Sequence, residues 1–165
     1  RREPLEAVAA EIAASGGEAL VLPADSSVEP EIAAAMDDAA KRWGGLDIVV
    51  SNAGIELLGQ DDRVDRLDRA VWDRLLTTNL TGQFLACKHG ARHLLATGGG
   101  AIVHNASIDA SGGDGPFASY NAAKAGLLGL NRTMALELAP TIRAIDLVIG
   151  FWRDVAFRAW SCGGR

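Results

Sequence analysis

Residues 101–138 contain a short apolar run, then a glycine-rich loop, then a long stretch with a helical pattern. The run Ala101-Ile102-Val103 is typical of a buried strand. Apolar residues then recur at helical spacing from about 118 to 138. A buried strand followed by a helix is the βα unit from which parallel sheets are built. This segment therefore predicts that the chain folds as an α/β protein.

The other elements expected from the sequence repeat this alternation. Strands alternating with helices indicate a doubly wound parallel sheet of the Rossmann-like kind. The chain has 165 residues, of which 48% are hydrophobic, and we expect one incomplete domain spanning residues 1–165. The expected strands are residues 18–22, 46–50 and 142–149, and the expected helices are residues 4–15, 26–43 and 71–96.

Tyr120 and Lys124 stand four residues apart and would share one face of the last helix. A free phenol titrates near pH 10 and is a poor acid or base at neutral pH. An ammonium group about 4 Å away interacts with the phenolate by roughly 4 kcal/mol at an effective dielectric constant of about 20. Lys124 would thereby make Tyr120 a candidate acid or base for alcohol–ketone interconversion, and Ser107 would hydrogen-bond the same substrate oxygen.

A tyrosine and a lysine at this spacing are more often a solvated pair on a helix surface. Ser107 favours a site instead, because it follows a predicted strand, and ligands bind at strand ends in open α/β sheets. With Ser107, Tyr120 and Lys124 in this order, the chain resembles the short-chain dehydrogenase/reductase family, whose catalytic group is Asn, Ser and Tyr-x-x-x-Lys.

The resemblance implies a mechanism and a cofactor. Tyr120 would exchange a proton with the substrate oxygen, and Ser107 would position that oxygen. Lys124 would lower the pKa of Tyr120 and hold the nicotinamide ribose. A hydride would pass between NAD(P)(H) and a small carbonyl or alcohol substrate.

Two further segments match the cofactor-binding pattern of the family. Asn52-Ala53-Gly54 follows a predicted strand and resembles the N-A-G motif, in which the asparagine braces the sheet and the backbone lies against the cofactor. A small residue and a glycine permit such an approach, although a plain turn is the alternative. Asp25 matches an aspartate that contacts the adenine. Its alternative is a turn or cap residue before the next helix, which Ser26 or Ser27 is expected to cap.

Asn79 lies inside the predicted helix 71–96, in a Thr-Asn-Leu-Thr-Gly segment that resembles the catalytic asparagine segment of the family. The resemblance implies that Asn79 holds a kink and a water that links Lys124 to solvent. The alternative is an asparagine tolerated in a helix through a local hydrogen bond. The polar residues 55–68 predict a surface loop.

His89 and His93 have the four-residue spacing of a zinc pair. No third ligand accompanies them, so a structural pair is the preferred interpretation and no metal site is expected.

The ends of the chain depart from the family pattern. The phosphate-binding T-G-x-x-x-G-x-G loop is not found in the sequence, and the chain opens on a predicted helix. We therefore expect a fragment that lacks at least one βαβ unit. Residues 150–165 match no pattern of the family, so the resemblance covers roughly Leu5 to Val148.

Charge and composition narrow the expected partners. The net charge of −5 gives no electrostatic reason to expect nucleic acid or an anionic membrane surface. No apolar run approaches the roughly 20 residues of a membrane span. Two cysteines, Cys87 and Cys162, are too few for a disulfide framework and fit a cytoplasmic location. The resemblance implies a homodimer or homotetramer formed through the helices at 70–96 and 118–138.

Several alternatives stay open at this point. Arg1 and Arg2 would hold a 2′-phosphate, which gives NADP a slight preference over NAD as cofactor. The rival to an oxidoreductase is a catalytically inactive fragment that acts at most as an oligomerisation or binding module. An epimerase or dehydratase of the same fold is a third interpretation. Cofactor binding discriminates between the first two.

Overall fold

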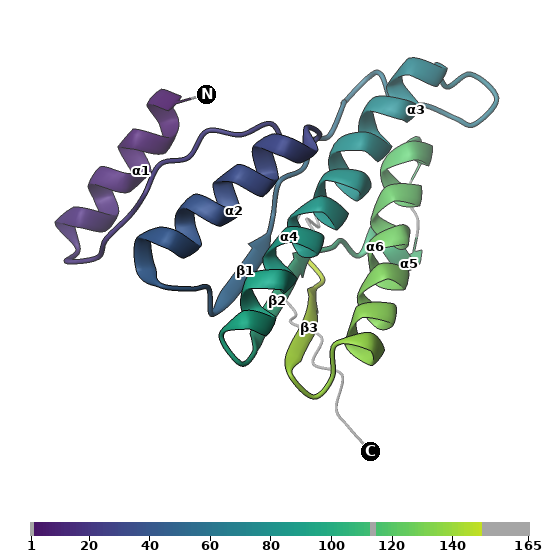
Figure 1. Ribbon diagram of the computed structural model, residues 1–165. Helices are drawn as coiled ribbons and strands as arrows, with labels where there is room; N and C mark the ends of the chain where they lie inside the picture. Colours follow the sequence, from purple (N-terminus) through teal and green to yellow (C-terminus); the bar gives the residue numbers. More distant parts are fainter. Residues whose placement is uncertain (1, 113–114, 150–165) are drawn as a thin grey trace.

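The computed structural model describes residues 2–112 and 115–149. Figure 1 shows the arrangement of the helices and strands. Their order is α1 (Arg2–Ala14), α2 (Glu29–Trp43), β1 (Ile48–Ser51), α3 (Arg69–Leu76), the π-helical segment η1 (Thr77–Thr81), α4 (Gly82–Ala96), β2 (Gly100–Asn105), α5 (Asp109–Gly112), α6 (Ala118–Glu137) and β3 (Ile142–Leu147).

The three strands form one parallel sheet in the order β1-β2-β3. Ile48 pairs with Ala101 across the first interface, and Gly100 pairs with Ile142 across the second. Helix α4 packs against all three strands, α6 packs against β3, and α2 packs against α4. In Figure 1, α4 crosses in front of the sheet, with α2 on its left and α6 on its right. The predicted Rossmann-like α/β fold is therefore confirmed.

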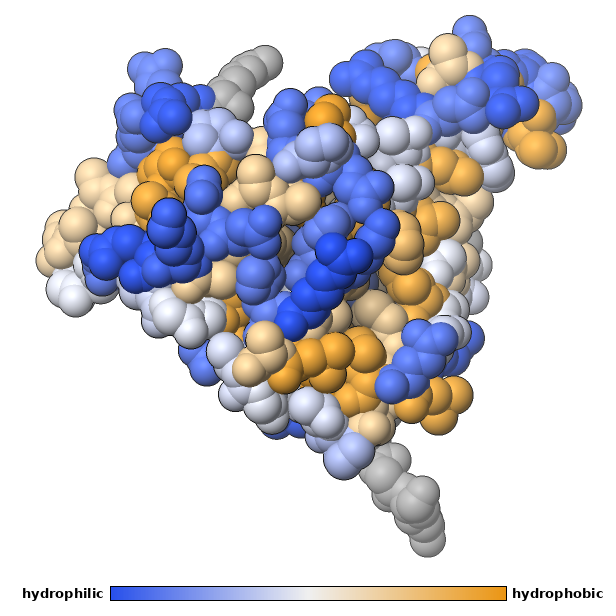
Figure 2. Space-filling model, in the orientation of Figure 1, coloured by the Kyte–Doolittle hydropathy of each residue, from blue (hydrophilic) through white to orange (hydrophobic). Residues whose placement is uncertain are grey.

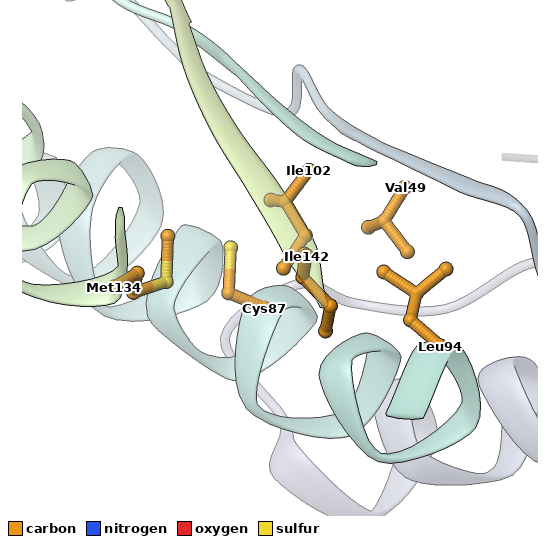
Figure 3. Packing of buried hydrophobic residues seen from close by; sticks show 6 residues of the cluster. All are labelled: Val49, Cys87, Leu94, Ile102, Met134 and Ile142. Atoms are coloured by element: carbon orange, nitrogen blue, oxygen red, sulfur yellow. The ribbon is translucent and has the colours of Figure 1, made fainter. Parts of the chain in front are cut away.

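The core lies between the sheet and the helices α4 and α6. Strand side chains alternate between the two faces, so β1 turns Val49 into the core and leaves Ile48 and Val50 exposed on the other face. Figure 3 shows how side chains from the strands and helices converge. The cluster consists of Val49, Cys87, Leu94, Ile102, Met134 and Ile142.

Polar side-chain contacts join α2 to α4 beside this core. His89 Nε2 lies 2.9 Å from Glu29 Oε1, and His93 Nε2 lies 2.8 Å from Asp37 Oδ1. Lys88 also contacts Glu29, with 2.6 Å between Nζ and Oε1. The two histidines thus act as a structural pair that holds one helix against the next.

Two local predictions are wrong. Residues 18–22 form no strand, because a strand needs a hydrogen-bonded neighbour and the described sheet consists of β1, β2 and β3 alone. Neither Ser26 nor Ser27 caps α2. The cap position is Val28, whose side chain makes no capping bond, and Pro30 occupies the first turn instead.

Helix α1 forms where the sequence predicts it, but it contributes nothing to the core of the described chain. Its apolar stripe of Leu5, Val8 and Ile12 is exposed, and none of its residues is buried. In Figure 1 it lies at the edge of the molecule, away from the sheet. Across the described residues, no helix has the length and apolarity needed to cross a membrane.

Candidate active site

The carboxyl ends of β1 and β2 meet at one edge of the sheet and place the predicted polar residues there. Asn52 directly follows β1, and Asn105 is the last residue of β2. Asn105 Nδ2 donates to Asn52 Oδ1 over 2.6 Å, which joins the two strand ends. Ser107 follows two residues after β2 and is 5% exposed. Asn52 therefore braces this edge, as a strand-end side chain can do without any ligand.

Ser107, Tyr120 and Lys124 come together at this edge. The Ser107 hydroxyl lies close enough to Tyr120 to act on the pKa of the phenol. Lys124 Nζ lies 5.6 Å from the centre of the Tyr120 ring and donates to the main-chain oxygen of Asn105 over 2.6 Å. Lys124 is buried, with 4% of its surface exposed. The structure thus brings together three side chains that are up to 17 residues apart in the sequence.

The electrostatics of Tyr120 differ from the expectation. Burial raises the pKa of Tyr120, and the carboxylates of Glu56 and Asp109 add to the rise, while the hydrogen bond from Ser107 opposes it. Burial also lowers the pKa of Lys124. The ammonium lies over the ring and donates to a carbonyl group. Desolvation is therefore the larger effect on the phenol, and the predicted lowering of its pKa is not found.

Asp109, which the sequence did not suggest, controls the proton of Ser107. The Ser107 hydroxyl donates to Asp109 Oδ2 over 3.0 Å, and the Asp109 backbone N–H donates to Ser107 Oγ over 3.2 Å. A hydroxyl has one proton, so Ser107 cannot donate to Asp109 and to the Tyr120 oxygen at the same time. To donate to a substrate oxygen, Ser107 must turn its proton away from Asp109.

Asn79 is fully buried in η1, where the helix widens into a π-turn. Its Oδ1 accepts from the Ile55 N–H over 2.7 Å, and its Nδ2 donates to the Ile55 oxygen over 2.8 Å. A Cβ atom at Gly54 would lie 3.2 Å from Asn79 Oδ1, so a side chain there would crowd the amide. Asn79 therefore holds the chain that leaves the N-A-G motif, and its water-binding role stays a prediction.

A second series of buried side-chain contacts reaches the N-A-G motif at Ala53. Gln83 Nε2 donates to the Ala53 oxygen over 3.2 Å, and Gln83 Oε1 lies 3.3 Å from His104 Nδ1. His104 Nε2 lies 3.4 Å from Cys87 Sγ. Burial, with a smaller contribution from the charge of Lys124, lowers the pKa of His104, and burial raises the pKa of Cys87 to about 12. Both groups are thus held neutral near neutral pH.

Asp25 lies in the exposed turn before α2. Its Oδ1 accepts from the Ser27 N–H over 2.8 Å and from the Ser27 hydroxyl over 2.6 Å, and these bonds lower its pKa. This is the turn role that the sequence left open as the alternative. The turn packs against the start of α4, because a Cβ at Gly82 would lie 2.9 Å from the Ser26 oxygen. A contact between Asp25 and adenine stays a prediction.

Two comparisons concern the amino-acid sequence. The family model described as short chain dehydrogenase matches residues 1–158, which extends past the range that the motifs covered. The cis-4-hydroxycyclohexanecarboxylate dehydrogenase of Sinomonas cyclohexanicum is 40% identical over 92% of the chain and 60% of its own length. FabG, a 3-oxoacyl-(acyl-carrier-protein) reductase of Staphylococcus aureus, is 33% identical over 84% of the chain and 55% of its own length.

Solved structures of short-chain dehydrogenases have the same fold as this chain. An NAD+-bound xylitol dehydrogenase superposes with a TM-score of 0.87 at 30% identity, covering 91% of the chain and 57% of the other. A short-chain type dehydrogenase/reductase from Mycobacterium marinum superposes with a TM-score of 0.83 at 33% identity, covering 88% and 60%. The chain spans little more than half the length of these relatives. With this fold, this site and a family model matched over residues 1–158, the chain belongs to the short-chain dehydrogenase family.

Proposed function

We propose that this chain carries the acid–base half of an oxidoreductase that transfers a hydride between NAD(P)(H) and a carbonyl or alcohol substrate. The observation that carries the proposal is the buried ammonium of Lys124, which lies 5.6 Å from the centre of the Tyr120 ring, with the Ser107 hydroxyl close enough to act on the pKa of the phenol. All three groups lie where β2 ends, the edge at which open α/β sheets bind ligands.

The residues act on the substrate oxygen. In the reducing direction the Tyr120 hydroxyl donates its proton to the oxygen as negative charge develops there, and Ser107 donates a hydrogen bond to it. Lys124 stabilises the phenolate that remains. The raised pKa of Tyr120 keeps the phenol protonated near neutral pH, so the site as it stands is prepared for carbonyl reduction. Alcohol oxidation reverses each proton movement.

The residues fit a nicotinamide cofactor, which supplies or accepts the hydride when it is bound. Lys124 is buried, and among residues 2–112 and 115–149 no carboxylate forms an ion pair with it. Its ammonium has three donors and gives one of them to Asn105, so it suits the uncharged hydroxyls of a ribose. Asn52, Ala53, Gly54 and Asp25 complete the proposed cofactor-binding set.

The preference for NADP rests on the start of the chain. Arg2 is exposed in α1 and contacts Glu6 in the same helix over 3.5 Å, an i,i+4 pair that is weak in water. Arg1 lies outside the described residues. An Arg2→Ala change that weakens NADPH binding more than NADH binding would support NADP.

Cofactor fluorescence tests the proposal on the chain itself. We expect saturable binding of NADPH or NADH, weakened in Lys124→Met and unchanged in Lys41→Met, which removes an exposed lysine.

A second experiment measures turnover of a panel of ketones, followed as loss of the reduced cofactor. Tyr120→Phe is expected to slow it by about 10²- to 10⁴-fold, the usual contribution of a general acid. Equal rates in Tyr120→Phe and the parent would contradict the assignment.

A binding or oligomerisation module is the second candidate, and a surface feature favours it. Figure 2 shows hydrophobic surface on the face that α4 and α6 present. Phe84, Leu95 and Leu136 are 43%, 48% and 83% exposed on these two helices. We infer a homodimer or homotetramer through this face. Light scattering of the parent and of Phe84→Glu tests it, and a parent that stays monomeric at high concentration contradicts it.

A further inference from the structure

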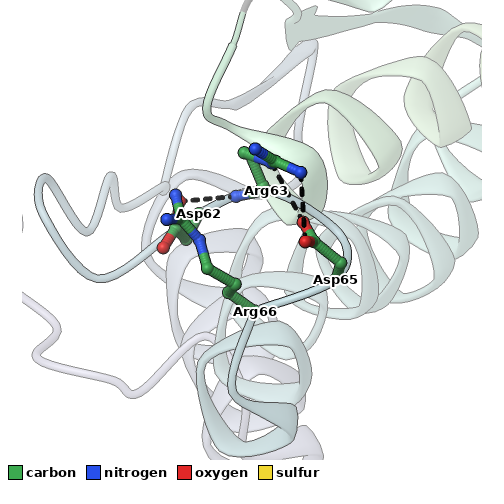
Figure 4. A network of polar contacts seen from close by, with 4 residues as sticks. All are labelled: Asp62, Arg63, Asp65 and Arg66. Atoms are coloured by element: carbon green, nitrogen blue, oxygen red, sulfur yellow. Dashed lines mark hydrogen bonds and ion pairs between the residues drawn. The ribbon is translucent and has the colours of Figure 1, made fainter.

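Asp61 differs from every charged neighbour in its loop, residues 52–68 between β1 and α3. Asp62, Arg63, Asp65 and Arg66 reach the surface and pair with one another, as Figure 4 shows. Asp61 is 3% exposed. The prediction that residues 55–68 form a solvated surface loop is therefore wrong at this one position. A buried carboxylate needs several hydrogen-bond donors to replace the water that it has lost.

The donors belong to the first turn of α6. Asp61 Oδ1 accepts from the Ser119 N–H over 3.2 Å and from the Ser119 hydroxyl over 2.7 Å. Asp61 Oδ2 accepts from the Tyr120 N–H over 3.0 Å. The first N–H groups of a helix have no partner inside the helix, and a side chain at the cap position usually takes one. Here the cap residue is Phe117, which makes no such bond.

Asp61 therefore caps α6 from a loop 58 residues earlier in the chain. Its negative charge lies at the positive end of the dipole of a 20-residue helix, which is a favourable position. Ser119 is fully buried, so water does not compete for these bonds. The cap is specific in position, because it fixes the backbone of Tyr120 itself rather than a neighbouring turn.

We propose that Asp61 is a positioning residue that holds the Tyr120 side chain beside Lys124, on the side of the site where Ser107 lies. Helix α6 begins at Ala118, two residues before Tyr120, so no preceding turn of helix fixes the direction of the Tyr120 side chain. The Asp61 bond supplies that restraint, and it ties α6 to the loop that leaves the N-A-G motif. The inference deepens the proposed function, on which it rests for its catalytic meaning.

Tyr120 is the only tyrosine in the chain, so its phenol can be observed alone. Tyrosine labelled with ¹³C at Cζ gives one resonance, whose position follows ionisation. In Asp61→Ala we expect this resonance to broaden or divide. We also expect its titration midpoint to fall toward that of free tyrosine, because the phenol leaves its buried place beside Ser107. Asp61→Asn keeps one acceptor oxygen, so we expect a smaller change in the same direction.

Asp68→Ala is the matched control. Asp68 caps α3, where its side chain accepts from the Ala70 N–H over 2.8 Å. Both changes remove a helix cap, so both lower stability, but only loss of Asp61 should move the Tyr120 titration. If Asp61→Ala does not fold, Asp61→Asn carries the test.

A Tyr120 titration that is the same in the parent and in each folded Asp61 variant overturns the proposal. So does an equal change in Asp68→Ala. The readout needs neither cofactor nor substrate, so its outcome is independent of whether the hydride-transfer proposal holds. If the chain turns over substrate, the same variants should lower kcat and leave KM nearly unchanged, with rates in the order parent, Asn, Ala.

Discussion

The segment from Arg69 to Ala96 serves two regions of the molecule that are held together differently. Toward its end, α4 buries Cys87 and Leu94 in an apolar cluster against the sheet. Near its middle, η1 and the first turn of α4 bury Asn79 and Gln83, whose amides bond the backbone of Ile55 and of Ala53. The end of the segment therefore buries apolar side chains, whereas its middle supplies hydrogen-bond partners for backbone groups.

The difference shows which region mainly stabilises the folded chain and which region mainly fixes the positions of its polar groups. Apolar contacts are non-directional and scale with buried area, so the cluster around Leu94 contributes mainly free energy of folding. Buried hydrogen bonds contribute less net free energy, but they are costly to leave unmade and fix atoms in place. The candidate site residues therefore lie in the region that depends on specific hydrogen-bond partners rather than on the amount of apolar surface buried.

The largest effect is expected in the apolar region. Leu94→Ala removes a fully buried side chain and leaves a cavity, which should lower the free energy of unfolding by about 2–5 kcal/mol. Leu95→Ala, at a neighbouring position that is 48% exposed, should change it by less than about 0.5 kcal/mol. Urea denaturation measures both. Similar losses in the two variants would remove the distinction between the faces of α4.

A smaller but local effect is expected at Asn79. Asn79→Ala leaves the Ile55 N–H and oxygen without their partner and should cost about 1–3 kcal/mol. Amide hydrogen exchange should accelerate at Ile55 more than in the core strands. Gln60→Ala, which removes an exposed amide from the same loop, should change neither quantity. Uniform acceleration across the sheet would show that Asn79 acts as part of the general core.

The smallest effect concerns Lys124 and pH. Burial lowers the pKa of Lys124, so the unfolded chain binds the proton more strongly than the folded chain does. The parent should therefore gain stability relative to Lys124→Met as the pH rises through the range in which folded Lys124 loses its proton. We expect this gain to continue until the pH reaches the pKa of an unfolded lysine, about 10.4, and urea denaturation at a series of pH values measures it. A constant difference would mean that Lys124 is not desolvated.

The sequence predicted the elements well where periodicity carried the signal. The strands at 46–50 and 101–103 and the helices at 71–96 and 118–138 all appear, with bounds that differ by a few residues. The prediction of a strand at residues 18–22 was wrong because a strand needs a neighbouring strand to pair with, and a local sequence pattern does not contain that information.

The site was predictable only in part. Ser107, Tyr120 and Lys124 were found because their types and spacing carry a chemistry. Asp61 stands in a run of charged residues that looks uniformly solvated, and it is buried by contacts with residues 58 and 59 positions later. His104 and Gln83 likewise meet across two elements. No local pattern marks such pairs.

The sequence by itself determined the alternation of strands and helices and the types of the candidate site residues, because periodicity and side-chain chemistry are local properties. Only the tertiary structure decided the partner of each polar group and its burial, because these depend on which segments meet. It reversed the expected direction of the Tyr120 pKa, because desolvation, which arises from the whole surrounding fold, raises that pKa.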